Sequence, residues 1–287
     1  MNDHVKGILI TTLGVLLVTP DSLFVRLLGG DPHVTAFWRG LGSGVSVLIY
    51  VLMFQGLRGF ASVLRTGWIG WTYIVLIGST TLAFVLAIEH TSVANAVFIF
   101  AAMPVFAMVF SWLLLGERVS GRMVWTMLAV AGGLGVIAYG SGESQIASWV
   151  GDVFALYVAA AYGLALTLVR KVKDTSMIPA IPIAYIGSAL IIWTYVDPFP
   201  AFATAAPTYV AHGVFIGAAT CLLTIGPRYI SSAEVSLLIL LESVLAPILV
   251  WMVVNEHPGV WAIAGGIIVI GALLVSNFVA MRRRRAQ

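Results

Sequence analysis

The chain has 287 residues, of which 60% are apolar and only 9% charged, with a net charge of +3 and a mean hydropathy of +1.03. A soluble domain carries roughly 25% charged residues, because its surface faces water. The composition therefore excludes a globular enzyme and indicates a protein whose surface faces lipid. The single cysteine, Cys221, cannot form an intrachain disulfide, and five scattered histidines predict neither a metal site nor a cofactor.

Long apolar stretches, separated by charges and by Gly, Pro or Asp clusters, predict an all-α membrane protein. Crossing the hydrocarbon takes about 20 helical residues, and backbone polar groups in lipid must be satisfied internally, which favours helices. The ten predicted transmembrane helices are 5–28, 32–54, 67–88, 92–114, 121–140, 148–170, 177–195, 206–228, 232–254 and 258–281. The connections are too short to hold a soluble domain.

The first stretch has an alternative interpretation as a signal peptide, because Lys6 precedes an apolar run from Gly7 to Thr19. No small-x-small cleavage site follows that run. We therefore expect this stretch to be the first span.

The basic residues predict that both termini are cytoplasmic in a bacterial-type inner membrane. With the N-terminus inside, thirteen of the fifteen fall on the cytoplasmic side: Lys6, Arg58, Arg65, Arg118, Arg122, Arg170, Lys171, Lys173, Arg228 and Arg282–Arg285. Arg26 and Arg39 lie within spans. The final arginine cluster is typical of an anchor on anionic lipid headgroups rather than a nucleic-acid site.

Internal similarity predicts two five-helix repeats, at 1–145 and 146–287. Shifts of 138 to 145 residues align Gly7 with Gly151, Arg26 with Arg170, Gly42 with Gly187, Trp112 with Trp251, Glu117 with Glu256 and Gly133 with Gly271. Five is an odd number, so the second copy enters the membrane from the opposite side. Inverted repeats of this kind are typical of alternating-access carriers.

Several motifs share these offsets and carry a family resemblance. They are His90–Ala96, Met103-Pro104, Leu113–Arg118, Ala131–Gly133 and Phe37-Trp38-Arg39, then Ile230–Ala233, Leu240–Glu242, Asn255-Glu256 and Gly265–Gly271. With them the chain resembles the drug/metabolite transporter (DMT) superfamily in its EamA branch, including YddG-like exporters of aromatic amino acids. It departs from the common pattern at Ser243, where many members have proline, and at Asn255, where glycine is usual.

The resemblance implies a secondary transporter, not an enzyme, that exports small amphiphilic metabolites such as amino acids from a central cavity. Its partners would be that small molecule and membrane lipid, with proton coupling as an option. An importer or exchanger on the same fold remains open. A membrane-embedded enzyme is a weaker alternative, because the sequence offers only isolated carboxylates.

Charges within spans are expensive and by default face a cavity or a partner. Glu242 lies ten residues into its span, roughly 15 Å along the helix axis. Two interpretations stay open for it: a cavity residue that binds substrate or protons, or a buried carboxyl bonded to backbone. Glu117, Glu234 and Glu256 are interpreted as structural residues at helix ends.

Asp21 and Arg39 are predicted to form an ion pair on sequential helices. Asp21 lies seven residues before the end of the first span and Arg39 seven residues after the start of the second, so both are about 10 Å deep. The alternative is that Arg39 extends to the headgroups while Asp21 caps a helix broken at Pro20.

The remaining cavity candidates are helix breaks and deep aromatic residues. Pro20, Pro104 and Pro247 are candidate breaks, and an interrupted helix exposes backbone groups that can bind polar substrates. Each proline can equally be a tolerated kink, and each aromatic side chain a core or lipid contact. The candidates on this ground are Trp38, Asn95, Phe98, Pro104, Tyr162, Tyr185 and Ser243.

Overall fold

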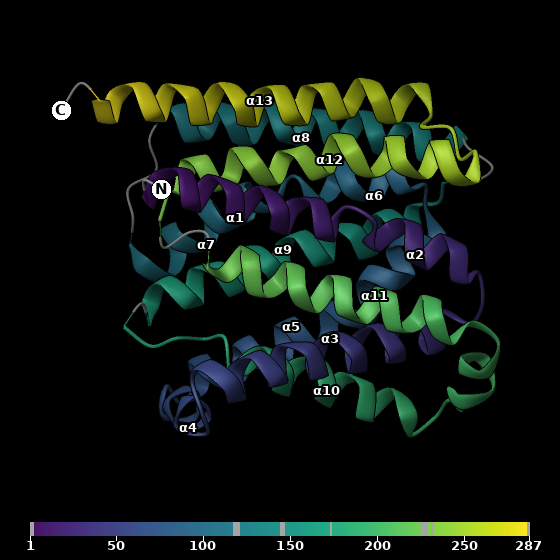
Figure 1. Cartoon of the computed structure of the whole chain (residues 1–287). Coiled ribbons are helices and arrows are strands. Elements are labelled where there is room, and N and C mark those ends of the chain that lie inside the picture. Colours follow the sequence, from purple (N-terminus) through teal and green to yellow (C-terminus); the bar gives the residue numbers. More distant parts are fainter. Residues whose placement is uncertain are drawn as a thin grey trace.

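The computed structural model describes residues 3–116, 121–143, 147–172, 174–225, 229–230 and 232–285. These residues form helices joined by short connections (Figure 1). In chain order the helices are α1 Asp3–Val18, α2 Asp21–Leu28, α3 Pro32–Phe54, α4 Arg58–Arg65, α5 Trp68–His90, α6 Val93–Phe100, α7 Met103–Leu115, α8 Gly121–Glu143, α9 Trp149–Lys171, α10 Ala180–Trp193, α11 Phe199–Ile225, α12 Ser232–Val254 and α13 Val260–Arg285.

The prediction of an all-α membrane protein is confirmed. Within the described ranges, eight helical stretches are long and apolar enough to cross a membrane. Two further apolar stretches, Ala180–Trp193 and Leu238–Val254, are shorter and fall inside the predicted spans 177–195 and 232–254. The first span packs through α1 against α11 and α12, so it is an integral part of the bundle.

Two spans are interrupted near a proline, as expected. The first consists of α1 and α2, separated at Thr19 and Pro20, and the fourth of α6 and α7, separated just before Pro104. Pro20 cannot donate a backbone hydrogen bond, and Thr19 bonds its own side chain back to the Val15 carbonyl at 2.8 Å. At Pro247 the alternative of a tolerated proline applies, because α12 continues through it. A membrane helix tolerates proline where neighbouring groups satisfy the freed carbonyl.

Helix α4 was not predicted. It is a single amphipathic segment whose Val63 is fully buried while Arg58 and Arg65 are exposed. In Figure 1 it lies at the end of the bundle that carries both termini. We call this end the termini face and the other end the opposite face. Such a helix is typical of an interfacial position.

Helices α8 and α13 pack on each other along one edge of the bundle (Figure 1). Gly133 of α8 lies against the carbonyl of Gly265, where an added Cβ would be 2.9 Å from that oxygen. On the far side of the bundle, α3 packs between α10 and α11. The core lies between these groups, around Val85, Ile88 and Val97.

The α3–α11 contact generates a stability prediction. A Cβ added to Gly213 would lie 2.6 Å from the Gly42 Cα, whereas one added to Gly187 would have no neighbour within 4 Å. Because backbone cannot move aside cheaply, Gly213→Ala should destabilise the fold by about 1–3 kcal/mol. Gly187→Ala is the matched control and should be neutral or slightly stabilising. Thermal unfolding in detergent tests both, and equal melting temperatures would contradict this packing.

Candidate functional site

The predicted ion pair between Asp21 and Arg39 is present in the centre of the bundle. Arg39 Nε donates to Asp21 Oδ1 at 2.9 Å and Nη2 to Oδ2 at 2.6 Å, and both residues are buried. The break at Pro20 makes Asp21 the first residue of α2, and Arg39 lies on α3. Two parallel charge-assisted bonds fix the planes of both groups. Arg39 therefore does not extend to the headgroups.

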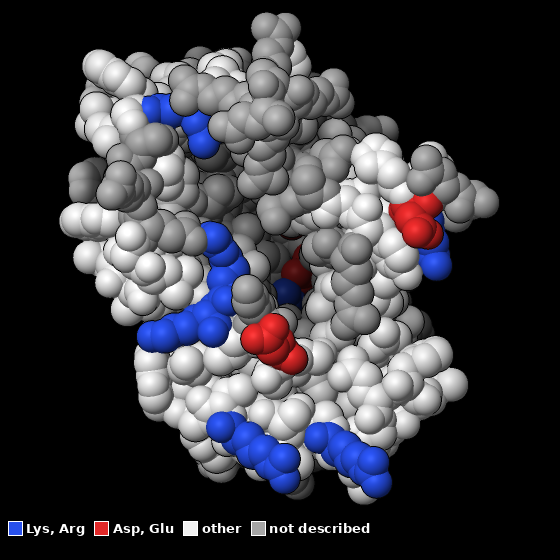
Figure 2. All heavy atoms as spheres, turned by 90° about the vertical axis from the view of Figure 1, so that its left-hand side faces the viewer, with Lys and Arg blue, Asp and Glu red and all other residues white. Residues whose placement is uncertain are grey.

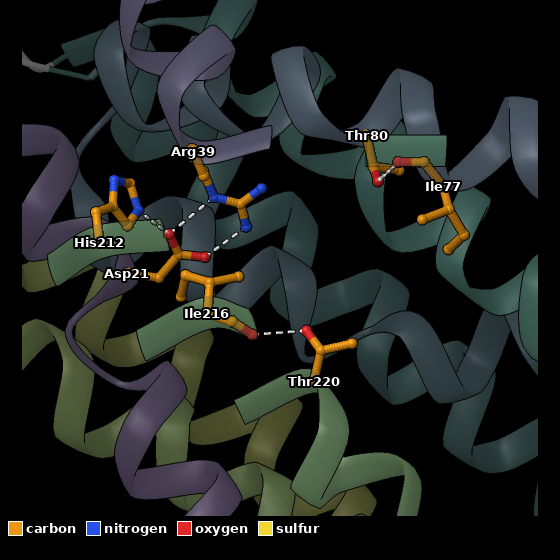
Figure 3. Close-up of polar contacts among 7 residues, drawn as sticks. All are labelled: Asp21, Arg39, Ile77, Thr80, His212, Ile216 and Thr220. Atoms are coloured by element: carbon orange, nitrogen blue, oxygen red, sulfur yellow. Dashed lines mark hydrogen bonds and ion pairs between the residues drawn. The ribbon is translucent and has the colours of Figure 1, made fainter. Parts of the chain in front are cut away.

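A third residue, His212 of α11, completes this cluster. Its Nε2 lies 2.6 Å from Asp21 Oδ1, and the three side chains converge in Figure 3. The His212 ring is fully buried and stacks on Phe24 with 5.1 Å between centroids. Since Asp21 accepts, we assign Nε2 as the donor, and the buried Nδ1 has no partner in the described part of the chain. A neutral imidazole fits this arrangement.

The Arg39 guanidinium uses only one edge for Asp21. Its Cζ lies 4.6 Å from the centre of the Phe84 ring, which covers one face. Nη1 has no hydrogen-bond partner among the described residues, and this atom is not completely shielded from solvent.

Glu242 lies on α12, which packs against α2, the helix that begins at Asp21. Its side chain is half-buried. In the described ranges it makes neither a hydrogen bond nor an ion pair. The neighbouring Ser243 is buried. The structure therefore does not support the interpretation of Glu242 as a carboxyl bonded to backbone.

Two predicted aromatic residues share a buried cluster. Tyr162 of α9 packs against the buried cluster that contains Tyr185 of α10. Tyr185 is buried and Tyr162 half-buried. The backbone carbonyl of Tyr185 lies beside Gly40, the residue after Arg39.

Other predicted residues lie elsewhere. Trp38 donates from Nε1 to the Pro198 carbonyl at 2.9 Å and stacks on Phe202. Its ring therefore packs against the end of the α10–α11 connection and the start of α11. Phe98 packs against Gly266 of α13. Pro104 is the second residue of α7 and is half-buried.

Asn95 belongs to a second polar cluster, around Asp152 at the start of α9. Thr91 Oγ1 donates to Asp152 Oδ1 at 2.7 Å, Ser141 Oγ donates to Oδ2, and Asn95 Nδ2 donates to Ser141 at 2.7 Å. These bonds satisfy a buried carboxyl group within the protein. Sequence reasoning missed Asp152, although its place four residues after Ser148 in an apolar span was a usable signal.

The opposite face is joined by an ion pair between the two halves of the chain. Arg26 Nε donates to Glu256 Oε2 at 2.7 Å, and Arg26 Nη2 donates to the Thr91 carbonyl at 2.8 Å. Glu256 Oε1 also accepts from the Val93 backbone N–H at 2.6 Å, at the first residue of α6. Glu256 was expected to be a structural residue at a helix end. It also bridges helices that are distant in sequence.

The termini face is hollowed at its centre, as Figure 2 shows. An acidic and a basic side chain are visible deep in this hollow, and several basic side chains lie on the same face. The bundle is thus open toward the termini, while the Arg26–Glu256 pair joins it at the opposite face. Glu117, Arg118, Lys173 and Arg228 lie outside the described residues, as do the side chains of Glu234 and Arg282–Arg285.

The central ion pair generates a second prediction. Asp21→Asn or Arg39→Gln leaves a charge unpaired in a low-dielectric interior, which costs about 3–5 kcal/mol in buried pairs. The double variant should lose less than the sum of the two, because it strands no charge. Exposed Asp174→Asn and Arg58→Gln are the controls and should change stability by less than about 0.5 kcal/mol. Unfolding in detergent measures all five variants. Additive losses would mean that the pair contributes no coupling energy.

Comparison with known proteins agrees with this architecture. A solved crystal structure of another protein is similar over 97% of this chain and 99% of that one, with a TM-score of 0.66 and 17% sequence identity. At that identity it supports the fold alone. None of the curated proteins matches the sequence. The model of the EamA-like transporter family matches residues 5–139 and again residues 149–278. The chain belongs to the EamA-like transporter family, and it is a multi-pass membrane transporter.

Proposed function

We propose that this protein is a secondary transporter that exports small amphiphilic metabolites, aromatic amino acids among them, by alternating access. Ten transmembrane helices would form two inverted repeats, 1–145 and 146–287. The observation that carries this proposal is the asymmetry of the bundle: it is hollow on the termini face and held together by Arg26 and Glu256 on the opposite face. A carrier caught open to one side has this form.

The helix contacts support the inverted repeat. If the first five spans are exchanged in order with the last five, each helix contact in one half should have an equivalent. The α5–α9 contact is equivalent to α1–α11, and the α3–α11 contact to α5–α10, and all four contacts are present. The α8–α13 and α3–α10 contacts each join two equivalent spans, so the exchange leaves them unchanged. Such matched contacts allow the halves to exchange conformations, which would close the termini face and open the opposite one.

The basic side chains support a cytoplasmic location for the termini face of an inner-membrane protein. Arg58, Arg65 and Lys171 are exposed at helix ends on this face. The two arginines within spans, Arg26 and Arg39, are both held in ion pairs instead. The hollow would then face the cytoplasm, where an exporter collects its substrate.

The combination of charged and aromatic residues in the spans supports an amphiphilic substrate. Arg39 and Glu242 would provide the charges, and Tyr162 and Tyr185 the aromatic rings. An enzymatic role is disfavoured, because the family whose model matches both halves of the chain is a transporter family. Direction and coupling depend on gradients, so import or exchange stays the second candidate.

The orientation prediction is tested by thiol labelling in a Cys221→Ser background. Asp174 and Asp197 are exposed in connections at opposite ends of the bundle. Asp197→Cys should react with a membrane-impermeant maleimide in intact cells, whereas Asp174→Cys should react only after permeabilisation. Labelling of Asp174→Cys alone in intact cells would invert the orientation.

Transport itself is tested by counterflow. Liposomes that contain the protein and unlabelled phenylalanine or leucine should transiently accumulate the labelled amino acid above equilibrium, because a carrier exchanges faster than it leaks. Protein-free liposomes are the control. A pH gradient should speed this flux in wild type and not in Glu242→Gln if that carboxyl couples protons. Absence of counterflow for every amino acid would reject amino-acid transport.

A further inference from the structure

Helix α4 carries two parallel stripes of exposed side chains. Arg58 and Arg65 are seven residues apart, and so are Leu57, which directly precedes the helix, and Leu64. Seven residues make about two helical turns, so the members of each pair lie on one side of the helix, roughly 10 Å apart along its axis. Both arginines are exposed, and the exposed fractions of Leu57 and Leu64 are 75% and 47%. A basic stripe therefore lies beside an apolar one.

The inner side of α4 holds these stripes in place. Val63 is fully buried in a cluster with Val51 of α3. A Cβ added to Gly59 would lie 2.9 Å from the Pro179 side chain, in the connection before α10. Val63 comes two residues before Arg65, so the two side chains project from opposite sides of the helix. The packing of Val63 thus directs the basic stripe outward.

Aromatic side chains indicate that α4 lies at the level of the lipid headgroups. Trp68 begins α5, Trp71 follows one turn later, and both are more than half exposed. Tryptophan is enriched where the hydrocarbon meets the headgroups. Lys171 lies over the Trp68 ring, 5.3 Å from its centre. Since α4 ends at Arg65, three residues before Trp68, its stripes lie close to the same level.

The positive charge of α4 is not balanced within the part of the chain that the structure describes. Arg58 and Arg65 form neither a hydrogen bond nor an ion pair with the described residues. The whole stretch from Pro32 to Ile88, which includes α3, α4 and most of α5, contains no Asp or Glu. Basic side chains lie along the lower edge of the termini face in Figure 2, at the level where Figure 1 shows α4. This edge therefore fits a partner with negative charge.

We propose that α4 is a binding surface for anionic phospholipids of the leaflet at the termini face, with headgroup phosphates on Arg58 and Arg65 and acyl chains along Leu57 and Leu64. A guanidinium can donate two parallel hydrogen bonds to a phosphate. A soluble anion would use the arginines and leave the leucines uncovered, whereas a phospholipid covers both stripes. The inference depends on the membrane setting of the chain and not on its substrate or direction of transport.

Competition between two lipids, measured by native mass spectrometry on the purified full chain, tests this surface. Detergent micelles hold equal amounts of phosphatidylglycerol and phosphatidylcholine with the same acyl chains, so the lipids differ only in their headgroups. The protein should retain phosphatidylglycerol over phosphatidylcholine by at least about fivefold, because a basic residue near the headgroups favours an anionic lipid to that extent. Equal retention of the two lipids would overturn the proposal.

Variants assign the preference to α4. Arg58→Gln/Arg65→Gln should bring the retention ratio close to one, whereas Arg58→Lys/Arg65→Lys should keep most of the preference, because an ammonium also binds phosphate. Lys6→Gln is the control: it removes a charge near the N-terminus, where Lys6 lies over the Tyr229 ring. An unchanged ratio in the double glutamine variant, or an equal fall in Lys6→Gln, would place the lipid elsewhere and contradict the proposal.

Thermal unfolding separates lipid binding from a folding defect and from binding of a soluble anion. In detergent without lipid, Arg58→Gln/Arg65→Gln should melt like wild type, because both side chains are exposed. Added phosphatidylglycerol should raise the melting temperature of wild type and not of this variant. Glycerol phosphate, which has the phosphate but no acyl chains, should raise neither. Equal stabilisation of wild type by glycerol phosphate would make a soluble anion the ligand and overturn the lipid assignment.

Discussion

The buried carboxylate of Asp21 is the constraint on which the interior depends. A fully buried ion in a membrane bundle is costly unless its charge is balanced and its lone pairs are bonded. Asp21 meets both conditions through Arg39 on α3 and His212 on α11. One carboxylate thereby ties three helices together, and the break at Pro20 puts it at the start of α2, deep in the bundle.

The position of Asp21 also determines the geometry of the groups around it. Asp21 bonds to two nitrogens of Arg39, and Phe84 covers one face of the guanidinium, so its orientation is fixed. Asp21 and Arg39 come from the first half of the chain, whereas His212 and Glu242 come from the second. The site therefore lies between the halves, where a rearrangement of one against the other would change access to it.

The sequence predicted what depends on local chemistry and chain neighbours. The spans followed from apolar length, and the Asp21–Arg39 pair followed from equal depth on consecutive helices joined by a short turn. The sequence did not predict the contact of His212 with Asp21 or the Arg26–Glu256 pair. The two residues of each contact are 191 and 230 positions apart, and no local pattern marks them. Trp38 was assigned to the cavity together with Arg39, but its ring bonds to the Pro198 carbonyl instead. Consecutive residues on a helix face different directions, so the two side chains do not share one site. Pro247 shows that proline alone does not locate a break.

The Arg26–Glu256 contact has a mechanical consequence in this account. If the opposite face must open during each cycle, a covalent link there stops the carrier, however well the central site binds. The most direct measurement is counterflow by an Arg26→Cys/Glu256→Cys variant in the Cys221→Ser background, before and after a short reducible thiol cross-linker joins the two positions. We expect cross-linking to stop counterflow and reduction to restore it. Counterflow at an unchanged rate in the cross-linked protein would contradict alternating access through this face.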